Sequence, residues 1–550
     1  MNLFNRFLFI FSFLLLTQSA CEEQKAQSPE AISAEIAQSP FSTDGFADAL
    51  QVLLPPIDTL ADKSVHASIT PRLKAMTLAY QRNEYLPIWF DENEVSGMAQ
   101  VCLHELDSLQ FEGLDSSRYH LALLQSLYQK VSAKQGHLSD IISFDTLMTH
   151  MYLLAAHDLL LGQSNINAVD SHWHHSNDTL WKPVSGLSAM GITKQYQSLA
   201  IYKSKWPLYS LMREASIHFH QLAQDSSFVL MQKQMTIQAN DSLVQAFIHQ
   251  EMPWLQSQAN DSLSELQQMI RGFQYYFGQR LTGKLDSTTL RYMQLAPTAI
   301  LQQIAVNQDR LRWMNQVPEQ MHIIVPLALM ELFLNKDGVD VMHMRTVVGK
   351  PARPTPSLNA KMVNVVLNPS WGVPPTILKK DIAPGLTQKG GAYLAKKDLK
   401  AYDRKGNVVS AATVNARNYK KFVYKQAPGE RNALGSIKFN LPNPFDIYLH
   451  DTPHKEDFPN RNRAKSSGCI RLQYPRELGV YILNVLEANP KMNRAAVDSI
   501  VLTHKTQYMP LKNRIPVHIV YLTVFKDSVG DHLRILEDVY HRDNAVAKQF

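Results

Sequence analysis

The run YLHDTPHKEDFPNRNRAKSSGCIRLQYP at residues 448–475 contains His450 near its start and Cys469 near its end. A thiol becomes a good nucleophile when a nearby imidazole takes its proton. Gly468 allows a tight turn that brings backbone amides near the thiol, as a tetrahedral oxyanion requires. Arg471 faces the same side as Cys469 if the run is extended, where it could anchor a carboxylate or brace the loop. The spacing alone leaves open whether Cys469 is a nucleophile or a buried thiol.

The chain around this run has the texture of a β-rich domain. Strand-like apolar segments flank the turn at residues 336–338, which predicts a hairpin, and the alternating run at 436–453 predicts further strands. A helix is expected at 476–490. The Lys- and Gly-rich stretch at 378–431 has weak periodicity, which is typical of a lid, a binding loop or a disordered insertion.

The chain before this domain has mostly helical periodicity. Apolar residues recur at three- and four-residue spacing from about residue 43 to residue 270, which predicts a helical scaffold. Residues 262–295 predict two helices around a turn, with Asp286 or Ser287 capping the second. Residues 301–314 predict another amphipathic helix.

The start of the chain resembles an export signal. MNLFNRFLFIFSFLLLTQSAC, at residues 1–21, has a basic residue, a short apolar run and two small residues directly before Cys21. This ending resembles a bacterial lipobox, so Cys21 is expected to carry lipid, and cleavage without lipid is the alternative. The polar segment that follows is expected to be a tether.

Composition limits the functional classes. At 550 residues the chain is long enough for about three or four domains, and its net charge is +6 without a concentrated basic stripe, so nucleic acid is not an expected partner. No CxxC or HExxH motif occurs, and no metal or cofactor is expected. Of the remaining cysteines, Cys102 is expected to be buried on a helix face, with a Cys102–Cys469 disulfide as the alternative.

The motif HDTP…SSGCIR resembles the signature of the L,D-transpeptidase catalytic domain, a His followed by Ser-His-Gly-Cys-x-Arg. Ser467 stands at the second histidine position, as in many members of the large, multidomain subgroup. Residues 347–377 resemble the segment that enters the active site in that subgroup. Residues 270–293 resemble a peptidoglycan-binding module, and residues 80–90 the start of the subgroup's helical scaffold.

The resemblance implies a role for each matching residue. Cys469 corresponds to the acyl-forming nucleophile and His450 to its proton acceptor and donor, oriented by a backbone carbonyl for which Asp451 is the candidate. Ser467, Gly468 and Cys469 correspond to the anion-stabilising turn. The residues expected to bind substrate are Tyr448, Trp371, Ser466 and Arg471.

The fold implied is a multidomain α+β protein with a helical scaffold, a small helical module and a β-rich catalytic domain with a lid insertion. The expected segments are a signal peptide at 1–20, a tether at 21–42, the scaffold at 43–255, a peptidoglycan-binding-like module at 256–300, a linker helix at 301–318, the catalytic domain at 319–505 with its lid at about 378–431, and C-terminal strands at 506–550.

The activity implied is transfer of a peptidoglycan tetrapeptide stem, with loss of D-Ala, to the side-chain amine of a second stem, giving a 3→3 cross-link. The expected setting is the periplasmic side of a cell envelope, with membrane attachment through Cys21 and a D,D-carboxypeptidase supplying donors. A sortase-like thiol enzyme and a wall-binding lipoprotein with an inactive catalytic domain are the alternatives.

Overall fold

The computed structural model describes residues 36–54, 71–170, 173, 181–237, 239–255, 263–314, 317–527 and 532–550. The chain divides into two compact units, Met1–Gln163 with Ser176–Ser204, and Ser164–His175 with Lys205–Phe550. The expected signal peptide, Cys21 and most of the tether lie outside the described residues. Across the described ranges, every helix is too short or too polar to cross a membrane.

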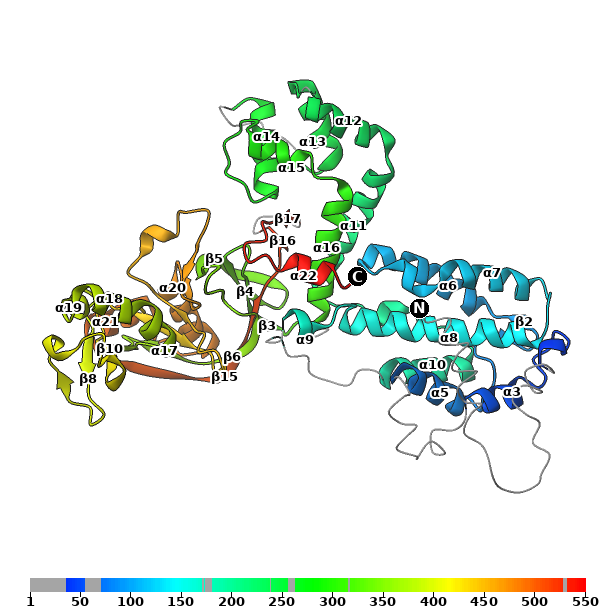
Figure 1. Ribbon diagram of the computed structural model, residues 1–550, viewed down its shortest axis with the longest axis horizontal. Helices are drawn as coiled ribbons and strands as arrows, with labels where there is room; N and C mark the ends of the chain where they lie inside the picture. The colour runs from blue at the N-terminus through cyan, green and yellow to red at the C-terminus, as the bar shows by residue number, and fades with distance from the viewer. Residues whose placement is uncertain are drawn as a thin grey trace, which may run out of the picture. The chain divides into compact units, whose positions relative to one another are not determined.

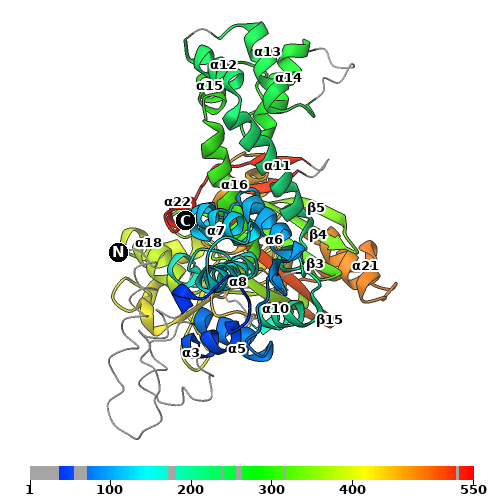
Figure 2. The ribbon, with the colours of Figure 1, turned by 90° about the vertical axis from the view of Figure 1, so that its right-hand side faces the viewer.

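The first unit is a helical domain built around one long helix. Its helix α8 (Leu138–Leu161) is buried along much of its length, and Figures 1 and 2 show the other helices on either side of it. The other elements are α3 (Phe46–Leu53), α5 (Pro71–Arg82), α6 (Gly97–Ser108), α7 (Leu121–Ser132), α10 (Trp181–Thr193), the 3₁₀ turns η2 (Leu109–Glu112), η3 (Ser116–Tyr119) and η4 (Leu199–Tyr202), and the hairpin of β1 (Phe90–Asp91) and β2 (Glu94–Val95).

A buried carboxylate connects the core elements of this helical domain. Asp145 on α8 accepts from the Trp89 amide at 2.8 Å and from the Tyr80 hydroxyl at 2.6 Å. Because all three side chains are fully buried, these bonds satisfy groups that would otherwise be costly inside the core. Cys102 on α6 is also fully buried and free, as expected, and Cys469 is free, so the disulfide alternative was wrong.

The second unit begins with a group of helices, most of which are drawn in green in Figure 1. They are α9 (Ile166–Val169), α11 (Pro207–Gln224), α12 (Ser226–Ile237), α13 (Asp241–Glu251), α14 (Glu265–Tyr276), α15 (Ser287–Met293) and α16 (Pro297–Arg312). The carboxylate of Asp286 accepts from the Thr289 amide at 2.8 Å, which confirms Asp286 as the cap of α15. The sequence grouped the helices up to residue 255 with the scaffold; in the structure α11 packs along α16, so these helices belong to the second unit.

A closed sheet forms the centre of the second unit. Its strands are β3 (Met321–Pro326), β4 (Glu331–Lys336), β5 (Val339–Gly349), β6 (Leu358–Leu367), β11 (Ile437–Asn440), β12 (Leu449–His450), β13 (Ala464–Ser466), β14 (Ile470–Leu472) and β15 (Gln507–Val520). The order is β13-β5-β14-β12-β11-β6-β15-β3-β4, and β4 also pairs with β5, which closes a barrel. The predicted hairpin at 336–338 is confirmed as β4–β5.

The insertion between β6 and β11 folds around a small core of its own, and we call residues 371–426 the lid subdomain. Its sheet has the order β7-β10-β8-β9, formed by β7 (Trp371–Gly372), β8 (Lys400–Tyr402), β9 (Val408–Val409) and β10 (Val423–Gln426). Its helical segments are α17 (Pro375–Ile377), η5 (Leu378–Ile382), α18 (Ala383–Lys389), α19 (Ala392–Lys396), η6 (Ala411–Thr413) and η7 (Tyr419–Lys421). Its buried core consists of Ile382, Leu386, Leu394, Leu399, Ala401, Val414 and Tyr424.

The two connections between the lid subdomain and the barrel are fastened to each other. The Asn368 amide donates to the Ser436 carbonyl at 2.8 Å. The Asn432 side-chain amide donates to the Pro369 carbonyl at 3.1 Å. The lid subdomain therefore leaves and re-enters the barrel at one narrow joint.

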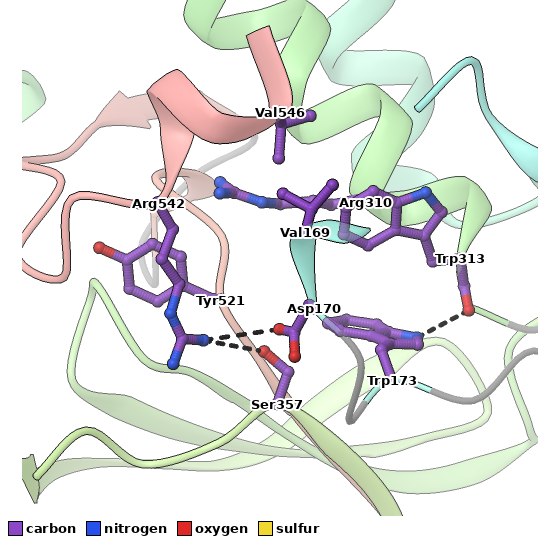
Figure 3. Close-up of a pocket in the computed structure, with 9 residues that line it drawn as sticks. All are labelled: Val169, Asp170, Trp173, Arg310, Trp313, Ser357, Tyr521, Arg542 and Val546. Carbon is purple, nitrogen blue, oxygen red and sulfur yellow. Dashed lines mark hydrogen bonds and ion pairs between the residues drawn. The ribbon is translucent and has the colours of Figure 1, made fainter. Parts of the chain in front are cut away.

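The remaining C-terminal elements cover the barrel. They are α20 (Pro475–Val480), η9 (Tyr481–Leu486), α21 (Arg494–Leu502), β16 (Val524–Lys526), β17 (Leu533–Ile535) and α22 (Asp543–Ala547). Figure 3 shows the region beside α22, where Arg542 lies 3.5 Å from both Asp170 and Ser357. The ring of Tyr521 lies there too and stacks on Tyr540 at 5.1 Å between centroids.

Candidate active site

The register of the barrel strands brings the residues singled out in the sequence to one face. His450 is paired with Arg471 across the parallel strands β12 and β14, and with Lys438 across the antiparallel strands β11 and β12. Tyr448 and Cys469 lie two residues before His450 and Arg471, so they share this face, because side chains alternate along extended chain. The structure thus gathers Cys469, His450, Tyr448 and Arg471 in one patch.

His450 is 5% exposed, and its Nδ1 atom contacts the main-chain oxygen of Asp451. A carbonyl oxygen only accepts, so Nδ1 carries the proton and Nε2 keeps a free lone pair. Burial lowers the pKa of His450 to about 3, with the neighbouring Arg471 as the next cause. The imidazole is therefore neutral at physiological pH and is ready to accept a proton at Nε2. The resemblance implied this main-chain contact.

Cys469 follows a strained turn. Gly468 has φ of 127°, a conformation that residues with a side chain rarely adopt. The buried Ser466 hydroxyl donates to the Cys469 carbonyl at 2.6 Å and accepts from the Gly468 amide at 3.1 Å. Burial raises the pKa of the Cys469 thiol, and hydrogen bonds from Tyr448 oppose that rise. The thiol is thus mostly protonated until a base acts on it.

Ser466 was expected to bind substrate, and the structure gives it a different position. Its side chain is 3% exposed and its hydroxyl is occupied by two main-chain groups of the turn. Ser466 holds the turn in shape, whereas the neighbouring Ser467 is exposed.

Asp451 and Arg471 brace the loops around the patch. The Asp451 carboxylate accepts from the Ser436 amide at 2.8 Å and pairs with Lys455 at 2.5 Å. Arg471 pairs with Asp457 at 3.2 Å. Of the two roles considered for Arg471, the structure contains the brace.

Arg353 joins the turn to the lid subdomain. Its guanidinium donates to the Ser467 hydroxyl at 3.0 Å and pairs through two nitrogens with the carboxylate of Asp381, which lies in η5. Such paired contacts are among the stronger ion pairs in proteins because both hydrogen bonds are charge-assisted.

A second support reaches the turn from the C-terminal segment. The fully buried Thr355 hydroxyl donates to the Gly468 carbonyl at 2.7 Å and accepts from the Gly349 amide at 2.9 Å. The Tyr540 hydroxyl donates to the Gly349 carbonyl at 2.6 Å. Tyr540 also stacks on Tyr521, one of the residues drawn beside α22 in Figure 3. Through Tyr540, Gly349 and Thr355, that region is therefore connected to the turn before Cys469.

A groove of about 550 Å³ lies beside this patch. Trp371 from the lid subdomain and Tyr448 from the barrel both line it, in agreement with the expectation that they border one pocket. The Cys469 thiol contacts the carbonyl of Asp446, another lining residue, at 3.5 Å. The groove therefore gives an extended ligand access to the neighbourhood of the thiol.

Four residues near the turn were missed in the sequence: Arg353, Thr355, Lys438 and Tyr540. For Lys438, the one signal in the sequence was the alternation of apolar and polar residues along its strand. For Arg353, Thr355 and Tyr540, the neighbouring residues in the sequence gave no signal. Within the described ranges, no group of three or more His, Cys, Asp or Glu side chains is arranged to hold a metal ion.

Two family models match the chain. Residues 320–485 match the model of the L,D-transpeptidase catalytic domain, and residues 74–215 match that of a scaffold domain. The first match contains the whole patch around Cys469 and His450, and the second lies mainly in the helical domain. The predicted α+β multidomain class is confirmed.

The chain is also similar to a named protein. A Haemophilus influenzae protein provisionally named an L,D-transpeptidase is 29% identical over 296 residues, which are 53% of this chain and 58% of that protein. The chain thus spans little more than half the length of this relative.

Two solved structures are also similar. An L,D-transpeptidase from Mycobacterium smegmatis is 14% identical over 37% of this chain and 59% of its own, with a TM-score of 0.18. The avibactam carbamoyl enzyme of the protein called Ldtfm is 13% identical over 37% of this chain and 49% of its own, with a TM-score of 0.19.

Proposed function

We propose that this chain, which contains the catalytic domain of the L,D-transpeptidases, is a peptidoglycan transpeptidase that works through a thioester on Cys469. The acyl donor is a tetrapeptide stem, and the acceptor is the side-chain amine of a second stem. The product is a 3→3 cross-link. The scaffold domain and the module at 256–300 hold the enzyme against its polymeric substrate.

Acylation begins with proton transfer from the Cys469 thiol to Nε2 of neutral His450. The thiolate attacks the carbonyl of the third residue of the donor, and the main-chain amides of Ser467 and Cys469 stabilise the oxyanion, because the Gly468 amide already donates to Ser466. The imidazolium then gives its proton to the departing D-Ala amine as the C–N bond breaks. A thioester and free D-Ala result.

Deacylation reverses the roles. The acceptor amine loses a proton to His450 as it attacks the thioester, and the thiolate leaves and regains that proton. One amide bond is broken and one is formed, so the thioester conserves the bond energy and no nucleotide is consumed. This balance suits an enzyme outside the cytoplasm.

The observation that carries the proposal is the contact between His450 Nδ1 and the Asp451 carbonyl, because it fixes the tautomer that leaves the lone pair on Nε2. The position of Cys469 on the same face of the sheet supports it, since a nucleophile and its base must share a face. The groove lined by Trp371 and Tyr448 provides room for a peptide donor.

The setting of the enzyme is also part of the proposal. An export signal that ends just before Cys21, together with lipid on Cys21, would hold the protein at the periplasmic side of the envelope. A D,D-carboxypeptidase acting earlier would supply tetrapeptide donors, because it removes the fifth residue of the stem.

The test is the intact mass of the purified protein after mixing with a carbapenem, with wild type beside Cys469→Ala. An adduct of one drug mass on the wild type alone is expected, followed by cross-linked product from disaccharide-tetrapeptide. An unmodified wild type would contradict the proposal and favour a wall-binding protein with an inactive catalytic domain. Adducts on both proteins would move the nucleophile away from Cys469.

A further inference from the structure

Lys438 projects from the barrel into the groove. On strand β11 its neighbours Ile437 and Phe439 are fully buried in the core, so the side chain of Lys438 emerges on the opposite face. There it lies directly across from His450 and lines the groove together with Trp371 and Tyr448.

The ammonium group of Lys438 lies against an aromatic ring. Within the described ranges it makes no ion pair, and its Nζ atom lies 4.1 Å from the centroid of the Tyr448 ring. Burial lowers the pKa of Lys438 from its ordinary value. A half-buried ammonium that lies on an aromatic face without an ion pair among the described residues is incompletely compensated, because a ring attracts a cation more weakly than a carboxylate does.

The other polar side chains of the groove leave this charge available. Asn440 on the same strand donates to Asn364 at 2.6 Å, so these two amides are engaged with each other. Asp446 lines the groove but makes no ion pair with Lys438 among the described residues, and its carbonyl faces the Cys469 thiol. The groove thus contains, beside the reacting thiol, a cation that makes no ion pair among the described residues, although the charges of Cys469 and Asp446 oppose the lowering of its pKa.

We propose that Lys438 binds a carboxylate of the acyl donor that lies next to the scissile amide, so that the enzyme selects donors with a negative charge at that position. This inference rests on the proposed function. The stem offers two such carboxylates, the free carboxyl on the side chain of the diamino acid and the C-terminal carboxyl of the departing residue. A charge-assisted hydrogen bond to either one would replace the water that Lys438 loses in the groove.

The experiment compares three tetrapeptide donors: one with both carboxylates free, one amidated on the diamino acid and one amidated at the C-terminus. Release of the terminal residue is measured with wild type, Lys438→Met, Lys438→Arg and Lys361→Met. Lys438→Met removes the charge and keeps an unbranched side chain, one heavy atom shorter, over Tyr448. Lys361 is an exposed lysine of β6 outside the groove and serves as the matched control.

With wild type, amidation of one carboxylate is expected to lower kcat/KM about tenfold or more. Lys438→Met should lower kcat/KM for the free donor by a similar factor, through KM, and should be insensitive to that amidation. Lys438→Arg should restore part of the discrimination, and Lys361→Met should behave as wild type. The carboxylate that Lys438 binds is the one whose amidation lowers kcat/KM with wild type and leaves it unchanged with Lys438→Met.

The same donors separate other outcomes. Lys438→Met could instead lower kcat/KM equally for all three donors and shift the iodoacetamide reaction of Cys469 to higher pH. That result would mean that Lys438 acts on the thiol and would overturn the proposal. Unchanged kinetics would overturn it as well. A wild type that takes a carbapenem adduct but turns over none of the donors would instead contradict the proposed function. A thermal melt checks that each variant is folded.

Discussion

Arg353 pairs with both carboxylate oxygens of Asp381, at 2.5 and 2.9 Å, and donates from the same guanidinium to Ser467, two residues before the thiol. This pairing lowers the pKa of Asp381. The contact therefore connects the lid subdomain directly to the turn that holds the nucleophile, and a change at either end is felt at the other.

Asp381→Asn should loosen the lid subdomain. The variant keeps the size of the side chain and removes its charge, at a cost of about 1 kcal/mol for a partly exposed pair. Hydrogen exchange across residues 378–389 should accelerate about fivefold. Because the pKa of Asp381 is lowered, the contribution of the pair is present above about pH 4 and is lost as the pH falls below that.

Asp398→Asn is the matched control for this prediction. Asp398 pairs with Arg431 at 2.9 Å, and both side chains are well exposed, so its loss should leave exchange across 378–389 unchanged. Equal acceleration in both variants would mean that the lid subdomain loosens through general charge loss and would contradict a specific role for Arg353.

The low pKa of His450 predicts the pH dependence of thiol alkylation. The imidazole is neutral above about pH 3, so no imidazolium stabilises a thiolate, and burial raises the pKa of Cys469. The rate of iodoacetamide reaction at Cys469, followed by peptide mass, should therefore rise about tenfold per pH unit and should still be rising at about pH 8. A plateau below pH 7 would indicate a resting thiolate–imidazolium pair instead.

His450→Gln separates this resting state from catalysis. The variant should keep the shape of the alkylation profile, because the native imidazole carries no charge in that range. Acylation by a carbapenem should slow about 100-fold or more, because the thiol then lacks its proton acceptor. Retention of full acylation by the variant would exclude His450 as the base.

Thr355→Val should disturb the turn from a distance. The change removes a hydroxyl that serves the Gly468 carbonyl and the Gly349 amide and leaves both main-chain groups buried without a partner. A stability loss of about 1–3 kcal/mol is expected, together with slower acylation. Thr355→Ser keeps the hydroxyl and should therefore retain both the stability and the acylation rate. A thermal melt measures the first and the rate of carbapenem adduct formation the second. Equal defects in the two variants would mean that the methyl group and its packing matter, and not the hydroxyl.

Gly468→Ala tests the backbone conformation of the turn. The added methyl would lie 3.5 Å from Ile447 and meets no clash, so its effect comes from the φ of 127°. A cost of about 1–3 kcal/mol is expected, with loss of the carbapenem adduct where the turn relaxes. Gly97→Ala, at a position with open space around it, should leave the adduct unchanged. An undiminished adduct in Gly468→Ala would show that the strained turn is dispensable.

The local parts of the candidate site could be predicted from the sequence. Cys469, His450 and the Asp451 carbonyl lie within one run, and the cap Asp286 lies within one turn of the helix it begins. Each depends on neighbours in the chain, and such interactions leave a pattern that can be read directly.

The remaining parts depend on contacts between distant segments. Lys438 faces His450 because β11 and β12 pair in one register, and a shift by one residue would turn it into the core. Thr355 contacts the Gly468 carbonyl, and Tyr540 contacts the Gly349 carbonyl, across more than 100 residues of sequence. A single sequence contains no local signal for such strand registers. It also does not show which way the Ser466 side chain points, which is why Ser466 was expected to bind substrate.

The separate core of the lid subdomain and its narrow joint have a mechanical consequence. Groups such as Leu386 and Tyr424 pack on each other and not on the barrel, so the lid subdomain can rotate as a rigid body without exposing apolar surface of its own interior. Such a rotation about the joint at Asn368 and Asn432, limited by the ion pair of Arg353, would change the width of the groove. Substitutions at Asn432 and Arg353, whose side chains make two of these contacts, should therefore change the size of donor that the groove accepts, without touching the thiol or the imidazole.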